Sequence, residues 1–151
     1  MRKRFLPALA IALLALASLA SYVYLERQVY HPVVQVVLPG GLSITAVLPD
    51  SRERRACDLA TERFLAPFKQ GCKECKVSAV RCDRNLEGPE RAMRDGGPLP
   101  YPMVVARDIR IAVFGPPEAA RTGCEFIAAD IMKKGVPTAT CVLAKTATVK
   151  P

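Results

Sequence analysis

The chain has 151 residues, of which 50% are hydrophobic and 24% are charged, and these proportions exclude a disordered chain and favour one domain over two. The formal net charge of +8 is moderate, since Arg2, Lys3 and Arg4 supply three of the positive charges. With no tryptophan and only 6% aromatic residues, the chain offers little surface for stacking sugars or bases. Because the sequence also predicts export of the domain, we expect no nucleic-acid partner.

The first predicted element is an uncharged apolar run from Phe5 to Leu25. Its 21 residues would form a helix of about 31 Å, which matches the hydrocarbon core of a bilayer. Basic residues precede the run, and only Arg27 follows closely, so the N-terminus should stay in the cytoplasm. Residues 1–25 are therefore predicted to hold a single-pass transmembrane anchor in a bacterial inner membrane, with the rest of the chain in the periplasm.

A cleaved secretory signal is the alternative, because Ser18 and Ala20 form a small-x-small pattern. The apolar run is longer than a usual signal core, and three tyrosines between residues 22 and 30 stand where a helix would leave the bilayer. These features favour an uncleaved signal-anchor followed by a juxtamembrane stalk, residues 26–32. Both interpretations export the domain formed by residues 33–151.

The same order of secondary-structure elements is predicted twice in residues 33–151. Residues 33–82 and 103–143 each contain two β-rich runs, an amphipathic helix and a closing strand. A polar linker of residues 83–100, with one helical turn around Glu90–Arg94, joins them. Four residues recur with the same spacing: Ile44, Pro49, Arg54 and Cys57 in the first copy, and Ile111, Pro116, Arg121 and Cys124 in the second. Chance similarity of two α/β segments is the alternative to a duplication. The predicted fold is α/β of the α+β type, with two tandem β-β-α-β units whose helices pack on one face of a mixed sheet.

The element boundaries follow from local patterns. The first copy should form strands at 33–38, 42–48 and 77–82, with a helix that begins near Asp50 or Ser51 as its N-cap. The second should form strands at 103–106, 109–114 and 138–143, with a helix from Pro116 or Pro117 to about Lys134. Each helix has one apolar face, made by Cys57, Ala60, Phe64 and Phe68 in the first and by Ala120, Cys124, Ile127, Ala128 and Ile131 in the second.

Six cysteines in an exported domain of this size indicate disulfides, although they allow fifteen pairings. If equivalent positions pair equivalently, Cys57 joins Cys82 and Cys124 joins Cys141. Cys72 and Cys75 then form a local structural disulfide. A redox-active pair remains an alternative, although no helix N-terminus would lower a thiolate pKa there. A zinc site is a further alternative, which would need Cys57 and Cys82 as additional thiolate ligands.

Residues that could carry chemistry are few. His31 is the only histidine and is expected to be solvated in the stalk, which argues against a multi-histidine metal site and a Ser-His-Asp triad. No catalytic residue, metal or cofactor is predicted. Arg52, Arg54 and Arg55 oppose the dipole of the first helix, so they form either a contact site for an anion or acidic partner or a solvated face.

These features favour a non-enzymatic function. The chain is expected to be a membrane-anchored binding or assembly module that acts through contacts with other proteins of the cell envelope. One alternative is a thiol–disulfide exchange protein that uses Cys72 and Cys75. Another is an envelope sensor that binds a small ligand or anion in a cleft between the two copies.

Overall fold

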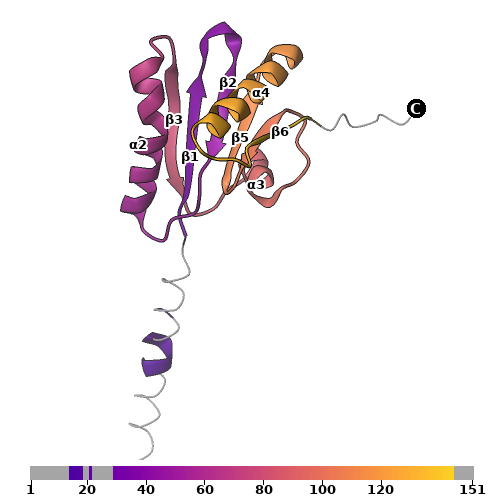
Figure 1. Cartoon of the computed structure of the whole chain (residues 1–151). Coiled ribbons are helices and arrows are strands. Elements are labelled where there is room, and N and C mark those ends of the chain that lie inside the picture. Colours follow the sequence, from indigo (N-terminus) through magenta and orange to yellow (C-terminus); the bar gives the residue numbers. More distant parts are fainter. Residues whose placement is uncertain (1–13, 19–20, 22–28, 145–151) are drawn as a thin grey trace, which may run out of the picture.

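The computed structural model describes residues 14–18, 21 and 29–144 and shows an α+β fold built on one six-stranded sheet (Figure 1). In spatial order, the strands are β3 (Lys76–Asp83), β1 (His31–Val37), β2 (Ser43–Val47), β5 (Ile109–Phe114), β4 (Met103–Ala106) and β6 (Thr140–Val142). All neighbouring strands are antiparallel, so the prediction of a mixed sheet is wrong. The reason is that β1 lies between β2 and β3, and β4 lies between β5 and β6, which separates the strands that run in the same direction.

The two sequence copies form two units of the same element order that meet at strands β2 and β5. The first unit forms strands β3-β1-β2 of the sheet and the second forms β5-β4-β6. Because β1, β2 and β3 correspond to β4, β5 and β6, the second unit repeats the first in reverse spatial order. At the junction Thr45 lies opposite Ala112, Ile44 opposite Val113, and Ala46 opposite Ile111. Since Ile44 and Ile111 are equivalent in the two copies, this register is symmetric about the Thr45–Ala112 pair. The units are thus related by an approximate twofold axis.

Helices α2 (Arg54–Gly71) and α4 (Pro117–Lys133) cover one face of the sheet (Figure 1). Alternate strand residues point toward them, because successive side chains of a strand lie on opposite faces. The largest residues of this core are valine, isoleucine and leucine, and full burial of each contributes about 1.5–3 kcal/mol. The buried cluster consists of Val34, Val36, Ile44, Ala46, Leu48, Leu65, Val104, Ile111, Val113, Ala120, Cys124 and Ala128.

The predicted start of the first helix is two or three residues too early. Helix α2 begins at Arg54, and Glu53 is its N-cap without a side-chain capping bond. The chain stays extended up to Ser51 because the backbone of Ser51 pairs with that of Tyr30, with N···O distances of 2.7 and 2.9 Å. Asp50, the other predicted N-cap, does not cap the helix, because its side chain is bonded to the buried imidazole of His31.

A third helix, α3 (Gly88–Asp95), lies within the predicted linker and packs on the opposite face of the sheet. The expectation that helices cover one face only is therefore wrong. Met93 is completely buried there, in a cluster with Val33, Val47 and Met103. From the same helix, Glu90 accepts hydrogen bonds from Gln35 of β1 and Arg81 of β3.

Tyr101 covers part of this second face. Its ring packs against Phe114, with 4.4 Å between the ring centroids. Burial of the phenol, with a further contribution from the negative charge of Glu90, raises the pKa of Tyr101 above its ordinary value. The phenol therefore stays protonated and packs as a neutral group.

The N-terminal predictions are only partly covered by the described residues. Within residues 14–18, 21 and 29–144, no helix is long and apolar enough to cross a membrane. The predicted anchor lies mostly outside these residues, although residues 14–18 are helical. The predicted stalk is too long at its C-terminal end, since His31 and Pro32 belong to β1 and are buried.

Candidate functional site

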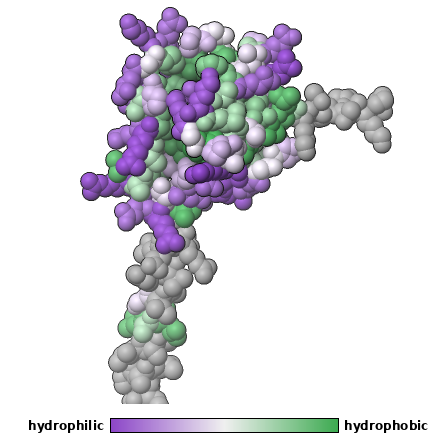
Figure 2. All heavy atoms as spheres, viewed as in Figure 1, coloured by the Kyte–Doolittle hydropathy of each residue, from purple (hydrophilic) through white to green (hydrophobic). Residues whose placement is uncertain are grey.

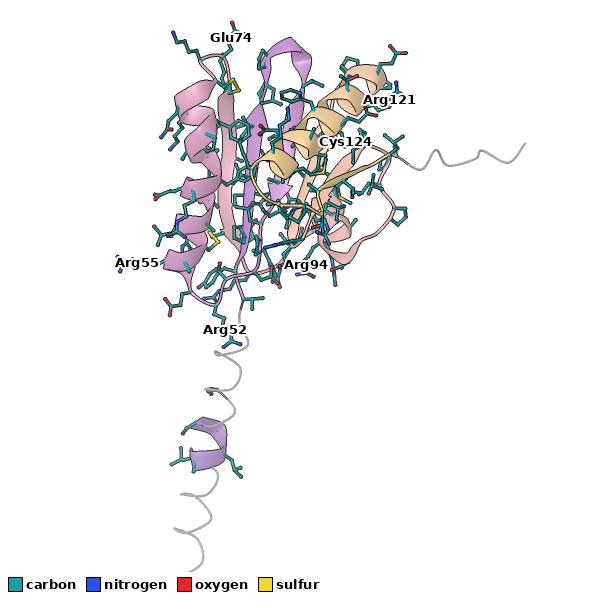
Figure 3. All side chains as sticks on the ribbon, viewed as in Figure 1. Arg52, Arg55, Glu74, Arg94, Arg121 and Cys124 are labelled. Carbon is teal, nitrogen blue, oxygen red and sulfur yellow. A yellow bond between two sulfur atoms is a disulfide. The ribbon has the colours of Figure 1, made fainter. Side chains whose placement is uncertain are left out.

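The arginine cluster predicted from the sequence lies at the base of the domain, by which we mean the end of the sheet where β1 begins and β2 ends. Arg52 precedes α2, Arg54 and Arg55 occupy its first turn, and all three are exposed. Figure 3 shows Arg52 and Arg55 projecting outward at the base, whereas Glu74 and Arg121 lie at the opposite end. Within the described part of the chain, none of the three arginines forms a salt bridge. The cluster therefore presents three exposed positive charges, with the exposed carboxylate of Glu53 between Arg52 and Arg54 in the sequence.

All six cysteines form disulfides, and the pairs are those predicted from the two copies. Cys57 joins Cys82 with a Cα–Cα distance of 6.0 Å, and Cys124 joins Cys141 with a distance of 5.6 Å. These bonds fasten α2 to β3 and α4 to β6, so each helix is tied to the strand that follows it.

The third disulfide, Cys72–Cys75, spans 5.4 Å between Cα atoms and joins the end of α2 to the start of β3. Cys72 is the C-cap of α2, and its backbone N–H donates to the carbonyl oxygen of Phe68. The negative end of a helix dipole destabilises a thiolate, whereas exchange chemistry requires a stabilised one. The position of the pair therefore favours a structural brace over thiol–disulfide exchange.

His31 is a buried residue at the base, with 3% of its side chain exposed. Its Nδ1 lies 2.6 Å from Oδ1 of Asp50, and its Nε2 lies 3.1 Å from Nη1 of Arg94. Since a guanidinium group can only donate, Nε2 accepts, and the proton on Nδ1 is donated to Asp50. The prediction of a solvated His31 is wrong, because pairing of Tyr30 with Ser51 draws this part of the chain into the sheet.

A pocket of about 360 Å³ lies beside this Asp50–His31–Arg94 chain, and we call it the base pocket. It is bounded by the segment after β2, the C-terminal end of α3 and the turn between β4 and β5, and its volume is within the range of small-ligand sites. The two copies both contribute, since Val47 of β2 lies opposite Arg110 of β5. The lining residues are Val47, Leu48, Pro49, Asp50, Arg94, Asp108 and Arg110.

The chemistry of the base pocket is that of a charged binding site. It presents two carboxylates and two guanidinium groups. The Nε2 of His31 is engaged by Arg94 rather than by a hydroxyl or thiol, so the arrangement lacks the nucleophile of a Ser-His-Asp triad. Within residues 14–18, 21 and 29–144, no group of three or more metal-ligating side chains is placed to hold an ion.

Sequence reasoning missed this site because its residues are far apart in the chain: His31 and Arg94 have a sequence separation of 63. One signal was available: His31 and Pro32 run without a break into the β-rich segment that follows. No protein-family model, curated protein or solved structure matches the chain. Its function is therefore inferred from the geometry of the described residues.

Proposed function

We propose that the chain is a membrane-anchored, non-enzymatic binding module whose folded domain is exported to the periplasm. The observation that carries the proposal is the oxidation of all six cysteines in three disulfides. Disulfides persist in oxidising compartments and brace small exported domains. The apolar run that ends at Leu25 supplies the anchor, and its described residues 14–18 are helical.

The anchor and the base of the domain are close in the chain. His31, the first residue of β1, follows Leu25 by only six positions. Even a fully extended connection of this length spans only about 20 Å. An anchored domain would therefore hold its base near the membrane surface, where the arginine cluster and the base pocket could both meet components of the envelope.

The arginine cluster is the surface that we expect to contact an acidic envelope protein. The triple variant Arg52→Ala, Arg54→Ala, Arg55→Ala should reduce capture of that partner by about fivefold, because complementary charge speeds association. The measurement is cross-linking in intact membranes, followed by mass spectrometry of proteins captured by the full-length chain.

A matched control removes three exposed lysines from the opposite end of the domain. Lys69→Ala, Lys73→Ala, Lys76→Ala changes the net charge equally, but these residues lie near the top of α2 and β3. Capture should be preserved in this control. Equal capture by wild type and the arginine variant would rule out the cluster as the contact surface.

Hydrophilic side chains project around the outline of the domain, with hydrophobic surface showing between them (Figure 2). Among residues 14–18, 21 and 29–144, the most exposed large apolar side chain is that of Phe126 of α4, at 72% exposure. Single exposed apolar residues are normal on soluble domains. The proposal therefore rests on the charged groups gathered at the base and not on the exposed apolar residues.

A further inference from the structure

The base pocket brings together charged side chains of both signs from separate parts of the fold. Asp50 and Arg94 reach it from the β2–α2 segment and from α3, whereas Asp108 and Arg110 reach it from the β4–β5 turn and β5. Among the described residues, no salt bridge within 4.0 Å joins one of these carboxylates to one of these guanidinium groups. Each guanidinium group has another partner: Nε of Arg94 lies 3.0 Å from Oδ1 of Asp95, and Nη1 of Arg110 donates to the carbonyl oxygens of Arg107 and Ile109. The two carboxylates and the two guanidinium groups thus line one pocket without pairing to one another, which suits a ligand that carries charge of both signs.

One imidazole fixes two of the four charged groups. His31 is buried and bonds Asp50 through Nδ1 and Arg94 through Nε2, so these groups are held at opposite ends of the ring. The side chains of Asp50 and Arg94 remain 44% and 35% exposed, which leaves both accessible to a ligand. Groups held in place before binding lose little freedom when a ligand arrives.

This arrangement selects against ligands of a single charge sign. A simple anion would meet the carboxylates of Asp50 and Asp108, and a simple cation would meet the two guanidinium groups. A zwitterion satisfies both sets. Arginine forms paired hydrogen bonds with phosphate oxygens, and a primary ammonium group offers three donors to carboxylates.

The position of the base pocket indicates where such a ligand would come from. Val47 lies opposite Val33 near the start of β1, so the pocket lies at the end of the sheet that the predicted anchor enters. The short connection to Leu25 brings this end within reach of lipid headgroups.

We propose that the base pocket binds a phosphoethanolamine group, the zwitterionic headgroup of a membrane phospholipid. Arg94 and Arg110 bind the phosphate, and Asp50 and Asp108 bind the ammonium group. The assignment of a lipid as the source rests on the proposed membrane anchor, whereas the chemistry of the pocket does not.

The chemistry is tested in solution with the full-length chain in neutral detergent micelles. Calorimetric titration should show saturable binding of glycerophosphoethanolamine. Binding of glycerophosphocholine, which lacks N–H donors, and of glycerophosphoglycerol, which lacks an ammonium group, should be at least about tenfold weaker. Equal binding of glycerophosphoglycerol, or tighter binding of the zwitterionic peptide Gly-Gly, would overturn the assignment.

Variants identify the residues involved. Arg94→Gln and Asp50→Asn should each weaken binding by about tenfold. Because both residues contact His31, the variants Asp108→Asn and Arg110→Gln provide a test that leaves the buried histidine untouched. Glu118→Gln and Arg121→Gln, which alter exposed residues of α4, are the matched controls and should bind as wild type. Unchanged binding by Asp108→Asn and Arg110→Gln would overturn the proposal.

The source of the headgroup is tested in nanodiscs. Amide hydrogen exchange of residues 47–50 and 94–96 should be slower in phosphatidylethanolamine discs than in phosphatidylcholine discs, and the double variant Asp108→Asn, Arg110→Gln should abolish this difference. Equal exchange in both discs would overturn the lipid assignment, even if the free headgroup binds. A chain that binds the free headgroup but fails to insert into discs would contradict the proposed anchor alone.

Discussion

Replacing Cys57 and Cys82 together by alanine should lower the free energy of unfolding by about 3.5 kcal/mol. This disulfide closes a loop with a sequence separation of 25, so it restricts the unfolded chain strongly. It also ties α2 to β3, an edge strand whose only neighbour in the sheet is β1. Urea denaturation of oxidised wild type and variant, followed by circular dichroism, measures the change.

The Cys72–Cys75 disulfide provides the control for this prediction. Its sequence separation is only 3, and the same loop-entropy relation gives about 2 kcal/mol for its removal. The variant Cys72→Ala, Cys75→Ala should therefore be the more stable of the two. The reverse order of stability would show that the two disulfides do not act through loop closure.

Truncating Met93 to alanine should cost about 2–5 kcal/mol of stability. Met93 is the completely buried residue of α3, and its loss leaves a cavity between this helix and the sheet. Hydrogen exchange in α3 should also quicken, because Met93 holds the helix against Val33 and Val47. Chemical denaturation and exchange measured by mass spectrometry test both effects.

An exposed methionine on α4 gives the matched control. Met132 is 45% exposed, so Met132→Ala should change stability by less than about 0.5 kcal/mol. If Met93→Ala costs no more than Met132→Ala, then α3 does not pack on the sheet as described.

Local patterns predicted most of the strands and both long helices. The strands at 103–106 and 109–114 have the predicted bounds, since alternating apolar residues and a turn define a hairpin locally. The paired cysteines followed from comparing the two copies. The sheet type could not be predicted in this way, and α3 was predicted only as one helical turn around Glu90–Arg94. Which strands become neighbours depends on the path of the connections, and an eight-residue helix with one buried side chain leaves little periodicity.

The candidate site was harder to predict than the fold. The arginine cluster was visible because its members are adjacent in the sequence. The base pocket joins residues from Val47 to Arg110 that lie close together only in the folded domain, where α3 packs on the sheet. His31 was assigned to the stalk because nothing in its immediate neighbours reveals Asp50 or Arg94 as partners. Its burial depends on a backbone pairing between Tyr30 and Ser51, which is a tertiary contact.

The most direct test of an exported, oxidised domain is thiol trapping in freshly isolated membranes from cells that make the native chain. The protein is denatured with a maleimide–polyethylene glycol reagent present, and its electrophoretic shift counts the free thiols among the six cysteines. We predict no shift without reductant and six added labels after reduction. Six labels on the unreduced protein would contradict export to an oxidising compartment.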